Sequence, residues 1–187
     1  GADTGFYGPR DLTIGPNKHI YIIDQGRARI AEFDPEIKQY PRVWGTKGLG
    51  EGQFEGPTGI AVGDNFVFVA DQVSGRIEVF DLTGQFVKQW EVPIWTKGVD
   101  ETPDVVFDEK TKTLYVSSGK ANVILAFDVD GNPKTELELR DAEKLSEPGA
   151  MAIGEANKQR WLYVVNRGTS TLLRFELPAP PPPAKKK

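Results

Sequence analysis

Four short polar side chains recur at the ends of apolar runs, 47 or 48 residues apart. They are Asp24, Asp71, Ser118 and Asn166. A carboxylate, hydroxyl or amide in such a place can accept hydrogen bonds from backbone N–H groups of a turn. The pattern favours this structural role. As an alternative, a ring of these groups around a central channel would hold a cation or a polar ligand.

Two arginines follow the two acids of this set at the same distance. Arg29 comes five residues after Asp24, and Arg76 comes five residues after Asp71. A guanidinium forms geometrically specific pairs with carboxylates. We therefore expect each arginine to bridge to a carboxylate of the neighbouring repeat, with contact to a ligand as the alternative.

A loop aromatic offers a second kind of binding site. Trp95 and Lys97 lie in the long connection 93–101, between two repeats. Aromatic side chains on loops are common anchors of protein interfaces. Both residues are therefore candidate binding residues, although packing of Trp95 against its own repeat is the simpler interpretation.

Residue types that support metal or nucleophilic catalysis are scarce. His19 is the single histidine, and the chain has no cysteine. Zinc enzymes use two or three His or Cys ligands, and no Gly-x-Ser-x-Gly nucleophile turn occurs. The sequence thus predicts no catalytic residues, no metal site and no cofactor.

The elements that must position these residues are four copies of one unit. Besides the polar set, a Phe–acid pair ends a run at 33–34, 80–81, 127–128 and 175–176. Within the runs, apolar residues mostly recur at every second position, the period of a half-buried strand. A repeat of this length with four short strands is typical of a propeller blade. We predict an all-β propeller with blades at about 8–55, 56–101, 102–146 and 147–177.

The last unit differs from the others at its outer edge. The third unit has an expected outer strand at 135–139, whereas a Pro-rich, Lys-ended tail at 178–187 follows the third strand of unit 4. Proline cannot donate to a strand ladder. We expect blade 4 to take its outer strand from another protein or from sequence upstream of Gly1, so that this chain is the C-terminal part of a longer polypeptide.

The repeated residues resemble NHL repeats. The matching segments are GEGQFEGPTGIAV at 50–62, VFVAD at 67–71 and RIEVFD at 76–81. The resemblance implies a propeller of usually six blades. It also implies a family that includes protein- and RNA-binding domains, extracellular sensor domains of bacterial kinases and a few metal-dependent lyases.

Charge and motifs together favour a binding function. The net charge of -4 weighs against a nucleic-acid partner, which usually requires a basic face. We expect a non-catalytic protein-interaction or ligand-binding scaffold within a larger protein or assembly. The alternatives are a propeller-type metal-dependent lyase or lactonase completed by absent blades, and an RNA-binding NHL domain. The repeat style suggests a bacterial, extracytoplasmic protein, and Lys185–Lys187 could lie close to an anionic membrane surface.

Overall fold

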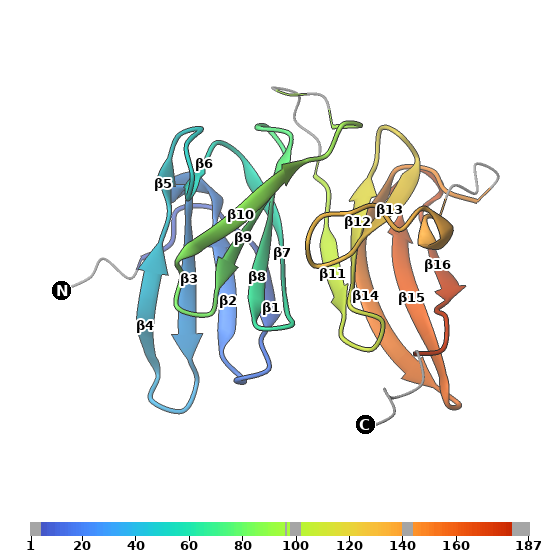
Figure 1. The fold of residues 1–187 in the computed structure, drawn as a ribbon, viewed down its shortest axis with the longest axis horizontal. Coiled ribbons are helices and arrows are strands. Elements are labelled where there is room, and N and C mark those ends of the chain that lie inside the picture. The colour runs from blue at the N-terminus through green and yellow to red at the C-terminus, as the bar shows by residue number, and fades with distance from the viewer. Residues whose placement is uncertain (1–4, 96, 98–101, 140–143, 181–187) are drawn as a thin grey trace, which may run out of the picture.

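The computed structural model describes residues 5–95, 97, 102–139 and 144–180, which form four antiparallel sheets side by side (Figure 1). Blade 1 contains β1 (Pro9–Ile14), β2 (Ile20–Asp24), β3 (Arg29–Asp34) and β4 (Gln39–Trp44), paired in that order. Blade 2 contains β7 (Pro57–Gly63), β8 (Phe66–Asp71), β9 (Arg76–Asp81) and β10 (Phe86–Glu91). A short parallel pair, β5 (Thr46–Lys47) and β6 (Gln53–Phe54), connects them.

The other two sheets have three strands each. Blade 3 contains β11 (Val105–Asp108), β12 (Thr113–Ser118) and β13 (Val123–Phe127). Blade 4 contains β14 (Pro148–Ala156), β15 (Gln159–Asn166) and β16 (Thr171–Glu176). Single 3₁₀ turns, η1 (Gln25–Arg27), η2 (Thr135–Leu137) and η3 (Arg167–Thr169), lie between or beside the strands. Within the described residues, no helix has the length and apolar character needed to span a membrane.

The predicted outer strand of unit 3 at 135–139 is wrong. Residues 135–137 form η2 instead, and only single bridges, Phe127 to Pro133 and Ile124 to Leu139, continue the sheet. Pro133 lacks the N–H that a ladder needs, and the Leu137 N–H closes the turn on the Lys134 carbonyl at 2.9 Å. In blade 4, β16 is the last strand of the described residues, as the sequence predicts.

The blades pack face to face around their first strands. β1 lies beside β7, β7 beside β11, and β11 beside β14, so the four sheets form an arc. Each of the three interfaces has its own apolar core, because alternate residues of a strand point to opposite faces of the sheet. This arrangement exposes one face of blade 1 and one face of blade 4.

Two tryptophans and two glycines fix the first two interfaces. Trp44 of β4 packs against Gly84 in the β9–β10 turn of blade 2, and Trp90 of β10 packs against Gly131 in the corresponding turn of blade 3. A Cβ at Gly84 would lie 2.8 Å from the Trp44 ring, and one at Gly131 would lie 2.5 Å from the Trp90 ring. Both glycines also have positive φ, 85° and 86°, a conformation that other residues rarely adopt.

Candidate functional site

Three of the four polar residues of the repeat hold the chain as it enters their blades. Asp24 accepts a hydrogen bond from the Tyr7 N–H at 2.7 Å, Asp71 from the Gly56 N–H at 2.7 Å, and Asn166 from the Ser146 N–H at 2.8 Å. We expected donors in the neighbouring turn, but these donors precede the first strand by sequence. Ser118 does accept from its own turn, from the Ala121 N–H at 3.4 Å. All four side chains are buried.

Among the described residues, the two arginines pair with acids of their own blades, whereas the sequence suggested acids of a neighbouring blade. The Nε of Arg29 lies 2.9 Å from Asp24, and Arg76 lies 2.9 Å from Glu78 and 3.6 Å from Asp71. The reason is strand register, because Asp24 lies opposite Arg29 and Asp71 lies opposite Arg76 in the antiparallel hairpins. Arg76 also donates to three carbonyls of the preceding connection, those of Leu49, Gly50 and Gln53.

Glu78, the acid beside Arg76, has an unusually high pKa. Burial raises the pKa of Glu78 to about 7, even though the Gly52 N–H and Arg76 both favour the carboxylate. The Gly52 N–H donates to Glu78 at 2.8 Å. Glu78 thus combines a raised pKa with a position at the junction of blades 1 and 2.

Trp95 and Lys97 have separate surroundings. The Trp95 side chain is 3% exposed and belongs to the core between blades 2 and 3, so it is not an anchor on the rim. Lys97 is exposed and forms an ion pair with Glu91 at 2.8 Å. Lys97 and Arg76 line one cavity of about 510 Å³ at the end of blade 2.

The structure also brings together two carboxylates that the sequence analysis missed. Asp11 in β1 and Asp104, just before β11, occupy equivalent positions in blades 1 and 3. Asp11 accepts a hydrogen bond from the Ile60 N–H of blade 2 at 2.8 Å, and Asp104 accepts one from the Met151 N–H of blade 4 at 2.6 Å. Each aspartate therefore ties its blade to the next one along the chain.

These two aspartates line a cavity of about 270 Å³ to which all four blades contribute. Thr58, Arg167 and the backbone of Gly149 lie on its wall. Burial, and then the charge of Asp11, raise the pKa of Asp104 to about 7, and burial also raises the pKa of Asp11. The cavity thus holds two carboxyl groups with raised pKa values, and Arg10 and Arg167 also line it. Repeats 2 and 4 carry Gly59 and Ala150 in the equivalent position, which is why the repeat pattern did not reveal the pair.

The outer face of blade 1 has the composition of an interior face. Leu12 and Ile14 of β1 are 60% and 65% exposed. By strand register they correspond to Ile60 and Val62 of β7, which pack against blade 1 in the first interface. Blade 1 therefore exposes to solvent the apolar positions whose equivalents in blade 2 pack against a neighbouring blade.

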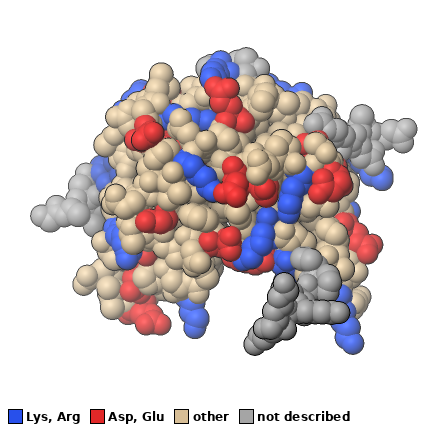
Figure 2. Space-filling model, viewed as in Figure 1, with Lys and Arg blue, Asp and Glu red and all other residues tan. Residues whose placement is uncertain are grey.

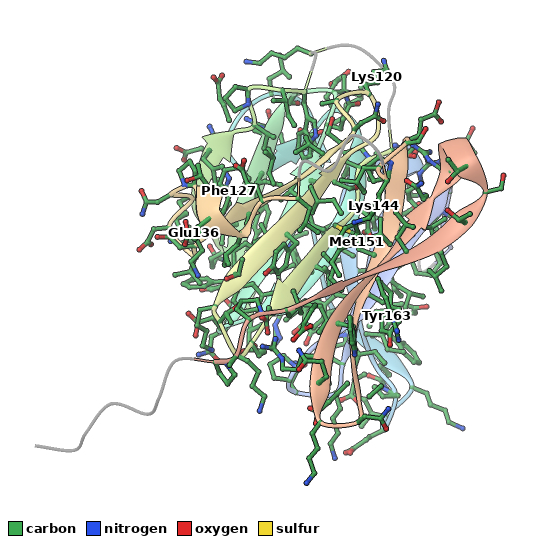
Figure 3. All side chains as sticks on the ribbon, turned by 90° about the vertical axis from the view of Figure 1, so that its right-hand side faces the viewer. Lys120, Phe127, Glu136, Lys144, Met151 and Tyr163 are labelled. Carbon is green, nitrogen blue, oxygen red and sulfur yellow. The ribbon has the colours of Figure 1, made fainter. Side chains whose placement is uncertain are left out.

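The outer face of blade 4 shows the same feature from the opposite side. Leu172 of β16 and Val165 of β15 are 67% and 44% exposed. Their equivalents in blade 1, Ile30 and Ile23, are fully buried against blade 2. Figure 3 shows the molecule from the side of blade 4 and labels Tyr163 on this sheet. Each end sheet of the arc thus exposes large apolar side chains at positions that the interior blades bury.

No protein-family model matches the sequence, and no relative is found among curated proteins. Solved structures do match by fold. Virginiamycin B lyase from Staphylococcus aureus has a TM-score of 0.61 at 16% identity, over 90% of this chain and 55% of that chain. An auxiliary nutrient binding protein from Bacteroides ovatus has a TM-score of 0.65 at 14% identity, over 95% and 47%. Hydrazine synthase from Kuenenia stuttgartiensis has a TM-score of 0.60 at 16% identity, over 93% and 50%.

The fold is β-propeller-like. This is what the matched structures share with the chain, and it agrees with the sheets and their arrangement. The chain spans about half the length of the structures it matches. The assignment of its repeats specifically to the NHL type stays a prediction.

Proposed function

We propose that this chain is a non-catalytic interaction module whose two end faces are covered by further blades. Those blades come from an upstream segment of the same polypeptide or from another protein, and the assembled propeller acts as a binding scaffold. The exposed apolar faces of blades 1 and 4 carry this proposal. Contiguous exposed apolar surface on a soluble protein commonly marks an interaction site.

The energetic argument rests on the equivalent positions within the arc. Burying a Leu, Ile or Val side chain contributes roughly 1.5–3 kcal/mol. Leu12, Ile14 and Leu172 forgo more than half of this contribution while they are exposed, and Val165 forgoes somewhat less than half. A further sheet on either side would recover it with the same contacts that the three interior interfaces already make.

Association of the chain tests the proposal. In sedimentation velocity over a range of concentrations, we expect the chain to self-associate through these faces when no other blades are supplied. Leu172→Lys should weaken the association at least tenfold. Leu49→Lys is the matched control, because Leu49 is 68% exposed in the turn between β5 and β6 and belongs to neither end sheet. A chain that stays monomeric, or equal effects of the two substitutions, would contradict the proposal.

One observation favours a second candidate, a propeller-type lyase or lactonase. A carboxyl group with a pKa near 7, such as Asp104, suits general acid–base catalysis at neutral pH. The cavity around Asp11 and Asp104 would then be the reaction site. Turnover of a lactone or a cyclic ester by the assembled protein, lost in Asp104→Asn, would support this candidate over the first.

The remaining proposals concern partners and location. We propose protein and not nucleic acid as the partner. In support, Lys and Arg are interspersed with Asp and Glu on the face in Figure 2, whereas nucleic-acid binders gather basic residues. A gel-shift assay in low salt tests this.

We also propose an extracytoplasmic location, which cell fractionation tests.

A further inference from the structure

The interface between blades 3 and 4 lacks the tryptophan that fills the other two interfaces. Trp44 lies opposite Ile30 in the ladder of blade 1, and Trp90 lies opposite Ile77 in blade 2. In blade 3 the corresponding bridge joins Ile124 to Leu139. Leu139 therefore occupies the tryptophan position of the third interface.

The aromatic surroundings of this position are nevertheless kept. Trp44 packs between Tyr21 of its own blade and Phe80 of the next, with ring centroids 6.3 Å and 6.1 Å away. Trp90 packs in the same way between Phe68 and Phe127, at 6.4 Å and 6.0 Å.

By strand register, Tyr115 and Phe175 are the equivalent pair in the third interface. The equivalent of the turn glycines Gly84 and Gly131 is Ala179. The ring walls of the site are thus present, but a shorter side chain stands between them.

A cavity lies at this place. Its volume is about 550 Å³, and its lining includes Leu139, Tyr115, Phe175 and Ala179. It opens beside η2, on which Figure 3 labels Glu136. Replacing a large side chain by a smaller one in a core leaves a space that apolar ligands can enter, and the volume falls within the range of small-molecule sites.

The charges around the cavity narrow the class of ligand. Tyr115 is 1% exposed, and burial raises its pKa to about 12, so this lining residue is uncharged at ordinary pH. Arg160 on the wall is already paired with the buried Asp108. Glu136, Glu138 and Glu176 also line the cavity, with Lys158 as the other cation. This excess of acid disfavours a ligand that carries a carboxylate.

We infer that the cavity between blades 3 and 4 binds a planar aromatic molecule of indole size, uncharged or positively charged, in the position of the missing tryptophan ring. The ring would pack between Tyr115 and Phe175, as Trp44 and Trp90 pack in their own interfaces. Because Tyr115 is 1% exposed, the ligand reaches it when the Leu139 side chain, which packs in the same core, moves aside. Binding needs no hydrogen bond to the ligand ring, because the indole nitrogens of both tryptophans are buried without a partner among the described residues.

Titration with fluorinated probes, followed by ¹⁹F NMR, tests this inference. We expect 5-fluoroindole and 5-fluorotryptamine to bind with Kd at or below the millimolar range, and 5-fluoroindole-3-acetate to bind at least fivefold more weakly. Leu139→Trp should place a ring in the cavity, reduce binding at least tenfold and leave the melting temperature unchanged or higher. Leu49→Trp is the control and should leave binding unchanged.

Two further measurements keep the inference testable if Leu139→Trp fails to fold. Leu139→Phe should fill part of the cavity and weaken binding by a smaller factor. In the unaltered chain, intermolecular NOEs should connect the probe to ring protons of Tyr115 and Phe175. Absence of binding up to the solubility of 5-fluoroindole, unchanged binding in a folded Leu139→Trp or Leu139→Phe variant, or NOEs to other residues only, would overturn the inference.

Discussion

Asp11 and Asp104 line the cavity to which all four blades contribute, and they make the stability of the folded chain depend on pH. Asp104 has a folded pKa of about 7 against an ordinary value of 3.8, so the folded state binds more protons than the unfolded state between these two pH values. Stability must therefore fall as pH rises through that window. The carboxylate of Asp104 lies near the charge of Asp11 and is partly desolvated, and both factors oppose its ionisation.

Asp104→Asn removes the ionisation and keeps the shape. The amide oxygen can still accept the hydrogen bond from the Met151 N–H. A shift of about three pH units corresponds to about 4 kcal/mol, and partial solvent exposure of Asp104 reduces this to about 2 kcal/mol. At pH 8 the variant should accordingly be more stable than the unaltered chain by about 2 kcal/mol, and at pH 4 the advantage should disappear.

Urea unfolding at the two pH values measures this difference, because the effects of groups that do not interact with Asp104 cancel between the two proteins. Asp11→Asn should give a smaller effect of the same sign, since it removes one cause of the shift in Asp104. Asp81→Asn is the control of opposite sign, because the hydrogen bond from Thr83 lowers the pKa of Asp81. An equal stability difference at pH 4 and pH 8 for Asp104→Asn would refute the reasoning.

Three further substitutions probe the packing of the blades. Asp71→Ala should cost about 3–5 kcal/mol in urea unfolding, because it leaves the buried Arg76 and the Gly56 N–H without this partner; a cost below 1 kcal/mol would contradict the assigned role. Gly131→Ala should destabilise by at least about 2 kcal/mol and change tryptophan fluorescence, because its Cβ meets the Trp90 ring at positive φ; an unchanged melting temperature would contradict this. Asp108→Ala should cost about 3–5 kcal/mol with little dependence on salt, since it breaks a buried pair between blades 3 and 4; a cost that salt abolishes would show the pair to be exposed.

The strands were predictable because their signal is local. Alternating apolar residues and a constant repeat spacing locate β7, β8 and β9 within a few residues, and Asp71 at the end of β8 marks the hairpin. Within the described residues blade 4 ends at β16, which was also predictable, because Pro178 and Pro180 cannot donate to a ladder. The strand predicted at 135–139 was wrong for a reason that is also local. Pro133 precedes this segment, whose apolar residues otherwise suit a strand.

The partners of the site residues were less predictable, because they depend on pairing in three dimensions. Arg29 and Arg76 could have been assigned to their own hairpins from the five-residue spacing, had strand register been considered. Burial of Trp95 and the approach of Asp104 to Asp11 depend on how neighbouring sheets pack, and a single sequence carries no direct signal for that.

The claim that further blades cover both end faces can be tested most directly by thiol labelling, because the chain has no cysteine of its own. Single variants Leu12→Cys, Leu172→Cys and Leu49→Cys would be labelled both in this isolated chain and in the protein as its own cells produce it. We predict that the first two variants react at least tenfold more slowly in the cellular protein, whereas Leu49→Cys reacts equally in both. Equal reactivity of all three variants in the two preparations would contradict the claim.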